Sequence, residues 1–89
     1  MSKRLKVYGF LGARRDAYTA QNHSGQTREI VAAKSIAEVM RITGRTRREL
    51  TNFGGVTGNP EEVSLAIGKP GSVFWKPLNG RAEFTEDSA

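Results

Sequence analysis

Three helix-start signals in the middle of the chain constrain its fold more than any other feature. Each signal places a capping side chain two or three residues before a carboxylate: Ser35 before Glu38, Thr46 before Glu49, and Asn59 before Glu61 and Glu62. The capping oxygens satisfy the free amides of a first helical turn, and the carboxylates favour the positive end of the helix dipole. Gly44, Gly54 and Gly68 then end the three apolar segments. The sequence therefore predicts three short helices between residues 36 and 68.

Segments with a strand pattern lie on both sides of these helices. In residues 4–11, the side chains at odd positions fall on one side of a strand and those at even positions on the other: Leu5, Val7 and Leu11 against Lys6, Tyr8 and Phe10. Residues 27–33 are apolar and β-prone, and residues 72–78 form a last strand. Gly9 interrupts the first strand, which indicates a bulge or a close approach of another group to the backbone. We predict an α+β fold in which a small three-stranded antiparallel sheet packs on three short helices, in the order β-β-α-α-α-β.

The 89 residues suffice for one small domain with a single modest core. We assign residues 1–80 to this domain and residues 81–89 to a flexible acidic tail, because the chain from residue 83 onward carries acids and no base.

Residues 12–26 show no sustained hydrophobic period and contain turn-forming residues. They predict a long polar loop, of a length that is uncommon in compact domains unless it has a function or is disordered.

The sequence offers no set of residues suited to catalysis or metal binding. It has no cysteine, and its single histidine, His23, falls in the polar loop. Glu61 and Glu62 are adjacent, so their side chains diverge on a helix, and capping accounts for both. One histidine without thiolates cannot assemble a zinc site. We expect a protein that is not an enzyme and that has no cofactor and no metal.

The chain is basic, with a net charge of +5 at pH 7. The first 15 residues contain no acid and include five bases, Lys3, Arg4, Lys6, Arg14 and Arg15. Such a balance favours adhesion to nucleic acid.

No apolar run reaches the ~18 residues that a membrane span requires, and the basic start lacks the apolar core of a signal peptide. We expect a cytoplasmic protein without membrane contact.

Residues 36–53 (IAEVMRITGRTRRELTNF) form the most distinctive stretch of the chain. Ile42 precedes Gly44, the hydroxyl of Thr46 follows it, and Leu50 comes six residues after it. This spacing resembles the helix-turn-helix of bacterial repressors. In that motif the glycine reverses the chain in a left-handed conformation, and the second helix enters the major groove of DNA.

The resemblance implies a set of contact residues for nucleic acid or another partner. Arginine and asparagine side chains can read guanine and adenine edges, and other arginines can neutralise phosphates. The candidates are Arg41, Arg45, Thr46, Arg47, Arg48, Thr51 and Asn52, together with Arg14 and Arg15. Met40 and Arg45 depart from the pattern, because a small residue and an apolar residue usually occupy these positions. Two capped helices in an ordinary α+β core, with a solvated arginine face, would account for the same residues.

The overall order of elements also resembles small uncharacterised proteins encoded by bacteriophages and prophages. The resemblance includes the segments Val56-Thr57-Gly58-Asn59 and residues 70–78 (PGSVFWKPL). It implies a small accessory protein that acts in the cytoplasm of a bacterial host cell by binding a host complex. An anti-CRISPR protein or another counter-defence inhibitor would belong to this class. The alternatives are a DNA-binding transcriptional regulator and a nucleotide-binding sponge, in which Gly9, Gly12, Arg14 and Arg15 would cradle a phosphate.

Aromatic residues on the predicted strands suggest a further contact between chains. Tyr8, Phe10, Phe74 and Trp75 supply both faces of the predicted sheet, whereas the predicted helices form a single layer. The second sheet face would then be solvated or covered by another chain. We therefore expect a homodimer or a docked complex.

Overall fold

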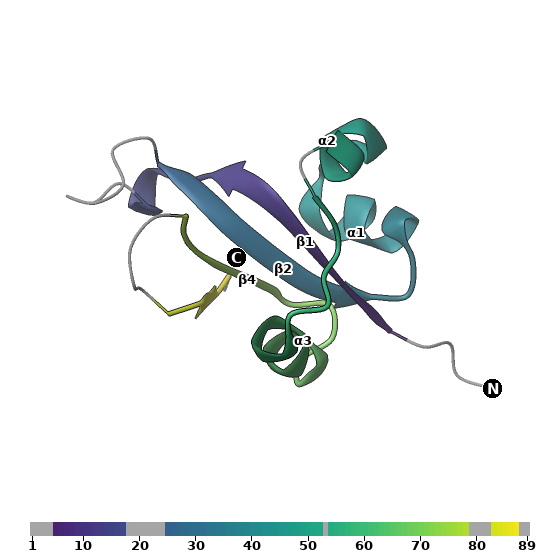
Figure 1. Ribbon diagram of the computed structural model, residues 1–89. Coiled ribbons are helices and arrows are strands. Elements are labelled where there is room, and N and C mark those ends of the chain that lie inside the picture. The colour runs from purple at the N-terminus through teal and green to yellow at the C-terminus, as the bar shows by residue number, and fades with distance from the viewer. Residues whose placement is uncertain (1–4, 18–24, 53, 79–82, 88–89) are drawn as a thin grey trace.

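Two long strands form the centre of the molecule, β1 (Lys6–Ala13) and β2 (Gln26–Ala33). The computed structural model describes residues 5–17, 25–52, 54–78 and 83–87. β1 and β2 pair antiparallel in a register that places Tyr8 opposite Val31 and Phe10 opposite Glu29. Tyr8, Phe10 and Val31 are aromatic or β-branched residues, which fit the pleated surface of a sheet. The two strands run through the middle of a five-stranded sheet with the order β3-β1-β2-β4-β5 (Figure 1).

The sheet ends in two short edge strands that the sequence pattern does not predict. β3 (Gly54–Val56) pairs with β1, and β5 (Thr85–Glu86) pairs with β4 (Val73–Pro77). The predicted three-stranded sheet is therefore wrong, because the described chain forms five antiparallel strands in the order β-β-α-α-β-α-β-β. Strands of three and two residues are too short to show a period of two. β5 also lies inside segment 81–89, for which a flexible tail is predicted, so its residues belong to the sheet.

The three predicted helices are present as α1 (Ile36–Thr43), α2 (Arg47–Asn52) and α3 (Pro60–Ile67). The Glu38 amide donates to Ser35 Oγ at 3.3 Å, and the Glu61 amide donates to Asn59 Oδ1 at 2.9 Å. These bonds satisfy amides that have no partner within the first helical turn. The predicted helix starts are therefore confirmed. A short 3₁₀ helix, η1 (Arg15–Ala17), follows β1, and no helix among the described residues is long and apolar enough to span a membrane.

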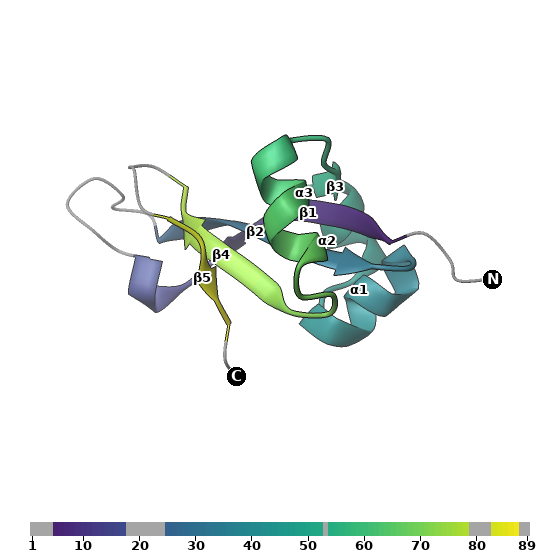
Figure 2. The ribbon, with the colours of Figure 1, turned by 90° about the horizontal axis from the view of Figure 1, so that it is seen from below.

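Helices cover both faces of the sheet. α1 and α2 lie on one face and α3 lies on the other, as Figures 1 and 2 show from two directions. The core accordingly has two parts: Phe10, Val31, Ala33, Val39, Leu50 and Val73 on the α1–α2 side, and Val7, Ile30, Ala32, Ala66 and Phe74 on the α3 side. The predicted single layer of helices is therefore wrong. The apolar residues of the second face, which suggested a second copy of the chain, pack beneath α3 instead.

Gly9 marks a close approach, as its position in the strand predicts. The guanidinium of Arg28, on the neighbouring strand β2, lies across Gly9 where any side chain would stand, since a Cβ at Gly9 would be 2.6 Å from Arg28 Cζ. From there Arg28 Nε and Nη2 each donate to the carboxylate of Glu62 on α3 at 3.0 Å. The Thr57 hydroxyl donates to the same carboxylate at 2.8 Å. This mostly buried ion pair ties α3 to the sheet.

The stability of the protein should depend on the charge of Glu62. The hydrogen bond from Arg28 lowers the pKa of Glu62 below its ordinary value of 4.5, with a further contribution from Thr57 and an opposing one from burial. A lowered carboxyl pKa stabilises the fold above pH 4.5, and this stabilisation disappears as the pH falls through the folded-state pKa. We expect Glu62→Gln to reduce the free energy of unfolding by about 1.5–3 kcal/mol at pH 7. Thermal unfolding of both proteins between pH 7 and pH 3 should show this difference shrinking below about pH 4.5. A difference that stays constant across the range would contradict the assignment.

Candidate binding surface

The stretch between α1 and α2 has the local geometry that a helix-turn-helix requires. Gly44 has φ of 73°, in the left-handed region, and its amide donates to the Met40 carbonyl at 2.8 Å. Thr46 starts α2, because the Glu49 amide donates to Thr46 Oγ1 and the Thr46 amide donates to Glu49 Oε1, both at 3.2 Å. The turn and the second helix start are therefore where the spacing predicts them. Phe53, the last residue of the predicted unit, lies outside the described residues.

α2 nevertheless differs from a free recognition helix. It has six residues, about 9 Å of helix, and β3 begins two residues after its end. Because β3 pairs with β1, the edge of the sheet fixes α2 in place. Val39 of α1 and Leu50 of α2 are buried against this part of the sheet, and Ile36 and Met40 pack against them. The opposite sides of both helices face outward.

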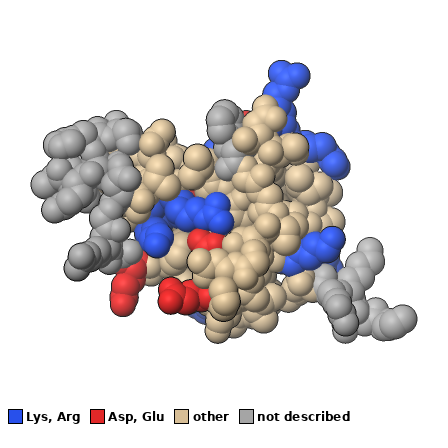
Figure 3. Space-filling model, in the orientation of Figure 1, with Lys and Arg blue, Asp and Glu red and all other residues tan. Residues whose placement is uncertain are grey.

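Three arginines on the outward sides of α1 and α2 are exposed and form no ion pair with a described residue. They are Arg41, Arg47 and Arg48, which we call the arginine surface. Thr51 and Asn52 lie beside Arg47 and Arg48 on the same exposed part of α2, one turn further along. Figure 3 shows Lys or Arg side chains that stand clear of the surface over α2, whereas another group in the middle of the view lies flat beside acidic atoms. The structure thus keeps these five predicted site residues accessible.

Arg45, a further predicted contact residue, turns inward instead. Its guanidinium lies over the ring of Phe10, 5.2 Å from the ring centroid, and its Nη1 atom is 3.5 Å from Glu49 Oε2. It is half-buried beside Gly12, where its Nη2 atom occupies the space that a side chain at that position would need. Arg45 therefore stabilises the junction of α2 with the sheet and is not part of the arginine surface. Thr46 is exposed, but its hydroxyl is engaged in capping α2.

Arg14 is held by the protein's own carboxylates. Its Nε and Nη2 atoms donate to Glu29 at 3.0 and 3.1 Å, its Nη2 atom also donates to Asp87 at 3.1 Å, and its guanidinium lies over Trp75. The hydrogen bond with Glu29 raises the pKa of Arg14 further, so the guanidinium stays charged. The structure therefore separates Arg14 from the exposed candidates. Arg15 is exposed, but it lies on η1 at the opposite end of the sheet from α2 (Figures 1 and 2).

The proposed phosphate cradle has no open space at its glycines. Arg28 covers Gly9, and Arg45 with Glu29 covers Gly12, while Arg14 is committed to ion pairs. These contacts disfavour the nucleotide-sponge alternative. His23 and residues 18–24 of the predicted loop lie outside the described residues. Among the residues that the structure describes, no group of His, Asp and Glu side chains could hold a metal ion.

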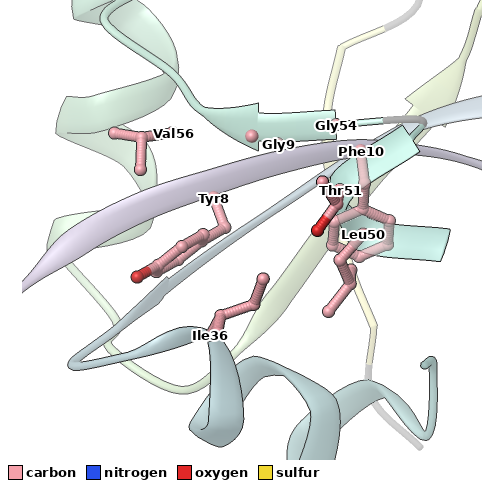
Figure 4. A pocket seen from close by; sticks show the side chains of 9 residues that line it. Tyr8, Gly9, Phe10, Ile36, Leu50, Thr51, Gly54 and Val56 are labelled. Carbon is pink, nitrogen blue, oxygen red and sulfur yellow. The ribbon is translucent and has the colours of Figure 1, made fainter. Parts of the chain in front are cut away.

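An apolar groove beside α2 is the feature that sequence reasoning missed. It has a volume of about 220 Å³, and its walls come from four elements: Tyr8 and Phe10 of β1, Ile36 of α1, Leu50 and Thr51 of α2, and Gly54–Val56 of β3. Figure 4 shows the side chains of Tyr8, Ile36 and Leu50 on the same side of β1, below it in this view. Two glycines on β3 leave one side of the groove without side chains. We call this feature the β3 groove.

Gly54 sets the distance between β3 and β1. A Cβ at Gly54 would overlap the carbonyl oxygen of Gly9 and would stand 2.6 Å from Phe10 Cβ. Only glycine therefore allows β3 to pair this closely, and the groove exists because of this pairing. The sequence signal was present in the Gly54-Gly55 dipeptide, but a helix stop explains the same residues. No family model, curated protein or solved structure matches this chain.

Proposed function

We propose that this protein is a non-enzymatic binding module that docks through the arginine surface onto an anionic face of a host complex that handles nucleic acid. A phage accessory protein of the counter-defence type would act in this way. One observation carries the proposal: the arginines divide into two groups. Among the described arginines, Arg14, Arg28 and Arg45 pair with the chain's own carboxylates, whereas Arg41, Arg47 and Arg48 on the two helices and Arg15 on η1 are exposed and form no such pair with a described residue.

Unpaired guanidiniums on a rigid support favour binding to anions. A guanidinium presents donors in a planar fork that matches carboxylate and phosphate oxygens two at a time. The capping bonds at Ser35 and Thr46 and the buried Val39 and Leu50 hold the two helices against the sheet. Less conformational entropy is then lost on binding. The two carboxylates on these helices, Glu38 and Glu49, form no ion pair with these arginines, and Glu49 is instead held by Thr46 and Arg45.

Direct binding to DNA is the second candidate. Arg47, Arg48, Thr51 and Asn52 are all exposed on α2, and their side chains can donate to base edges or phosphates. The short length of α2 and its attachment to β3 limit how far it can enter a major groove. For this reason we rank a DNA-binding regulator below docking to a host complex.

Affinity purification from a bacterial lysate tests the proposal directly. The baits are the wild type, Arg47→Ala/Arg48→Ala, and a charge-matched control, Arg15→Ala/Lys69→Ala, which removes two positive charges away from α2. Lys69 is exposed and pairs only with the exposed Glu86 among described residues, so its loss should affect stability little. We expect the wild type and the control to recover the same defined subunits, and the Arg47/Arg48 variant to lose at least about 90% of them, since two anion contacts of ~1.5 kcal/mol each are removed.

Treatment of the lysate with nuclease separates the two candidates. Recovery that survives nuclease supports a protein complex as the partner. Recovery that disappears supports DNA binding, and the slope of affinity against salt should then fall by about one unit for each lost phosphate contact. Equal recovery by all three baits, or no recovery by any of them, would reject the arginine surface as the docking site.

A further inference from the structure

The β3 groove lies next to the arginine surface. Thr51 forms part of the groove wall, and Arg47 precedes it by four residues on the same side of α2. A ligand that fills the groove would therefore come within reach of Arg47, and Arg48 follows on the adjoining outward side. The two features together define the chemistry of an occupant: apolar at one point and negatively charged beside it.

The outer edge of β3 adds a third feature. β3 is the last strand of the sheet on this side, and only its inner edge pairs with β1. Gly54, Gly55 and Val56 are exposed, Val56 to 61%, and the outer edge makes no backbone hydrogen bond to another described residue. Such an edge presents free amides and carbonyls to an extended chain. Peptides bind many domains by adding a strand at an edge of this kind.

The groove's size and lining select among possible occupants. A volume of 220 Å³ corresponds to about seven water molecules, which suits one large side chain and lies below the usual range for small-molecule sites. The walls are almost wholly apolar, so a nucleobase placed there would leave its polar edge without partners. Phe10 is only 1% exposed and offers no face for stacking. An aliphatic or aromatic side chain meets neither difficulty.

We infer that the β3 groove and the outer edge of β3 bind an acidic, extended segment of a partner protein, which inserts one large apolar side chain into the groove and places carboxylates against Arg47 and Arg48. This inference rests on the proposed function, because it names the kind of partner that the arginine surface contacts. Charge complementarity identifies the occupant, and the free strand edge identifies its conformation.

A random dodecapeptide display library provides the probe. Selection on the full-length wild-type protein should enrich sequences with several Asp or Glu residues around a single Leu, Ile or Phe. The enriched peptide, labelled with fluorescein, is then titrated by fluorescence polarisation. Replacing its apolar residue by serine, or its acids by lysine, should each weaken binding by at least tenfold. Enrichment of neutral or basic peptides would overturn the inference.

Variants that fill the groove test its location. Thr51→Trp and Val56→Trp enter it from opposite walls and change exposed positions outside the core, and both retain Arg47 and Arg48. Each should weaken peptide binding at least tenfold, whereas Leu65→Trp, which adds a tryptophan at an exposed position of α3 outside the groove, should leave it within about twofold. Circular dichroism melting checks that each variant is folded, and the second position serves if the first is not. Unchanged binding by both folded groove-filling variants would place the peptide elsewhere.

The same variants separate this inference from the proposed function. If Arg47→Ala/Arg48→Ala loses the lysate partner but both groove-filling variants retain it, the arginine surface stands and the groove does not take part. If duplex or single-stranded DNA binds the wild type tightly without displacing the labelled peptide, nucleic acid is the partner and the inference fails. If the selected peptide binds and the arginine and groove-filling variants both lose it, the inference holds.

Discussion

Arg14→Met is expected to lower the free energy of unfolding by roughly 3–5 kcal/mol, the loss that follows when one partner of a buried ion pair is removed. The side chain of Glu29 is only 4% exposed, and Arg14 donates two hydrogen bonds to its carboxylate. Without Arg14, the only side-chain hydrogen bond that this carboxylate would keep from a described residue is the one from the Thr27 hydroxyl, at 2.6 Å. Thermal unfolding should show a fall in Tm of at least about 12 °C, since each kcal/mol shifts a domain of this size by ~4–8 °C.

A second variant isolates the cause of this loss. In Arg14→Met/Glu29→Gln the buried group is neutral, and the amide oxygen can still accept the proton of Thr27. The double variant should therefore recover at least about half of the stability that Arg14→Met loses. For Arg15→Met, a change at the exposed neighbouring residue, the free energy of unfolding should stay within about 0.5 kcal/mol of the wild-type value. If the double variant is no more stable than Arg14→Met, the contacts of Arg14 with Trp75 and Asp87 dominate instead.

Phe10→Ala is expected to destabilise the protein by roughly 3–5 kcal/mol, as large-to-small changes of buried aromatic residues do. Phe10 is 1% exposed and packs with Val39 and Leu50, so it joins the sheet to both helices of the arginine surface. Its removal leaves a cavity and takes away the ring on which Arg45 lies. Urea unfolding followed by tryptophan fluorescence should show a lower midpoint with an unchanged slope.

Leu11→Ala is the matched control for Phe10→Ala. Leu11 follows Phe10 in β1, points to the other face of the sheet and is 37% exposed. The free energy of unfolding of Leu11→Ala should fall by less than about 1 kcal/mol, because much of the Leu11 side chain already contacts water. Equal losses for the two variants would mean that the α1–α2 side of the sheet does not form the larger part of the core.

Local signals predicted the helices well because each helix start depends on residues close together in the chain. The capping pairs Ser35–Glu38 and Thr46–Glu49 span three residues each, and the structure forms both. The left-handed turn at Gly44 is equally local. Such features depend little on the rest of the fold. The starts of α1, α2 and α3 therefore follow from the sequence pattern alone.

The edge strands and the second layer of helices could not be predicted in this way. β3 and β5 exist because β1 and β4 offer edges to them, and a period of two cannot appear in three or two residues. The side of the sheet that α3 covers depends on the path of the chain through β3. The β3 groove depends on the same path, since it forms only when β1, β3, α1 and α2 meet.

The arginines illustrate the same limit at the candidate site. Arg45 and Glu49 are four residues apart on the chain, so their pairing could have been anticipated from helical spacing. Arg14 and Arg28 find partners 15 and 34 residues away, and Asp87 is 73 residues from Arg14. A sequence pattern cannot tell such arginines from free ones. Composition alone thus overestimates the basic surface that is available for binding.

The guanidinium of Arg28 above Gly9 makes two positions on neighbouring strands interdependent. Any side chain at Gly9 would occupy the space of that guanidinium, and a shorter residue at 28 would release the constraint on residue 9 while leaving Glu62 without its main partner. Substitutions at these three sites are thus tolerated in combination rather than singly. Chains descended from a common ancestor with this one should exchange residues 9, 28 and 62 as a correlated set.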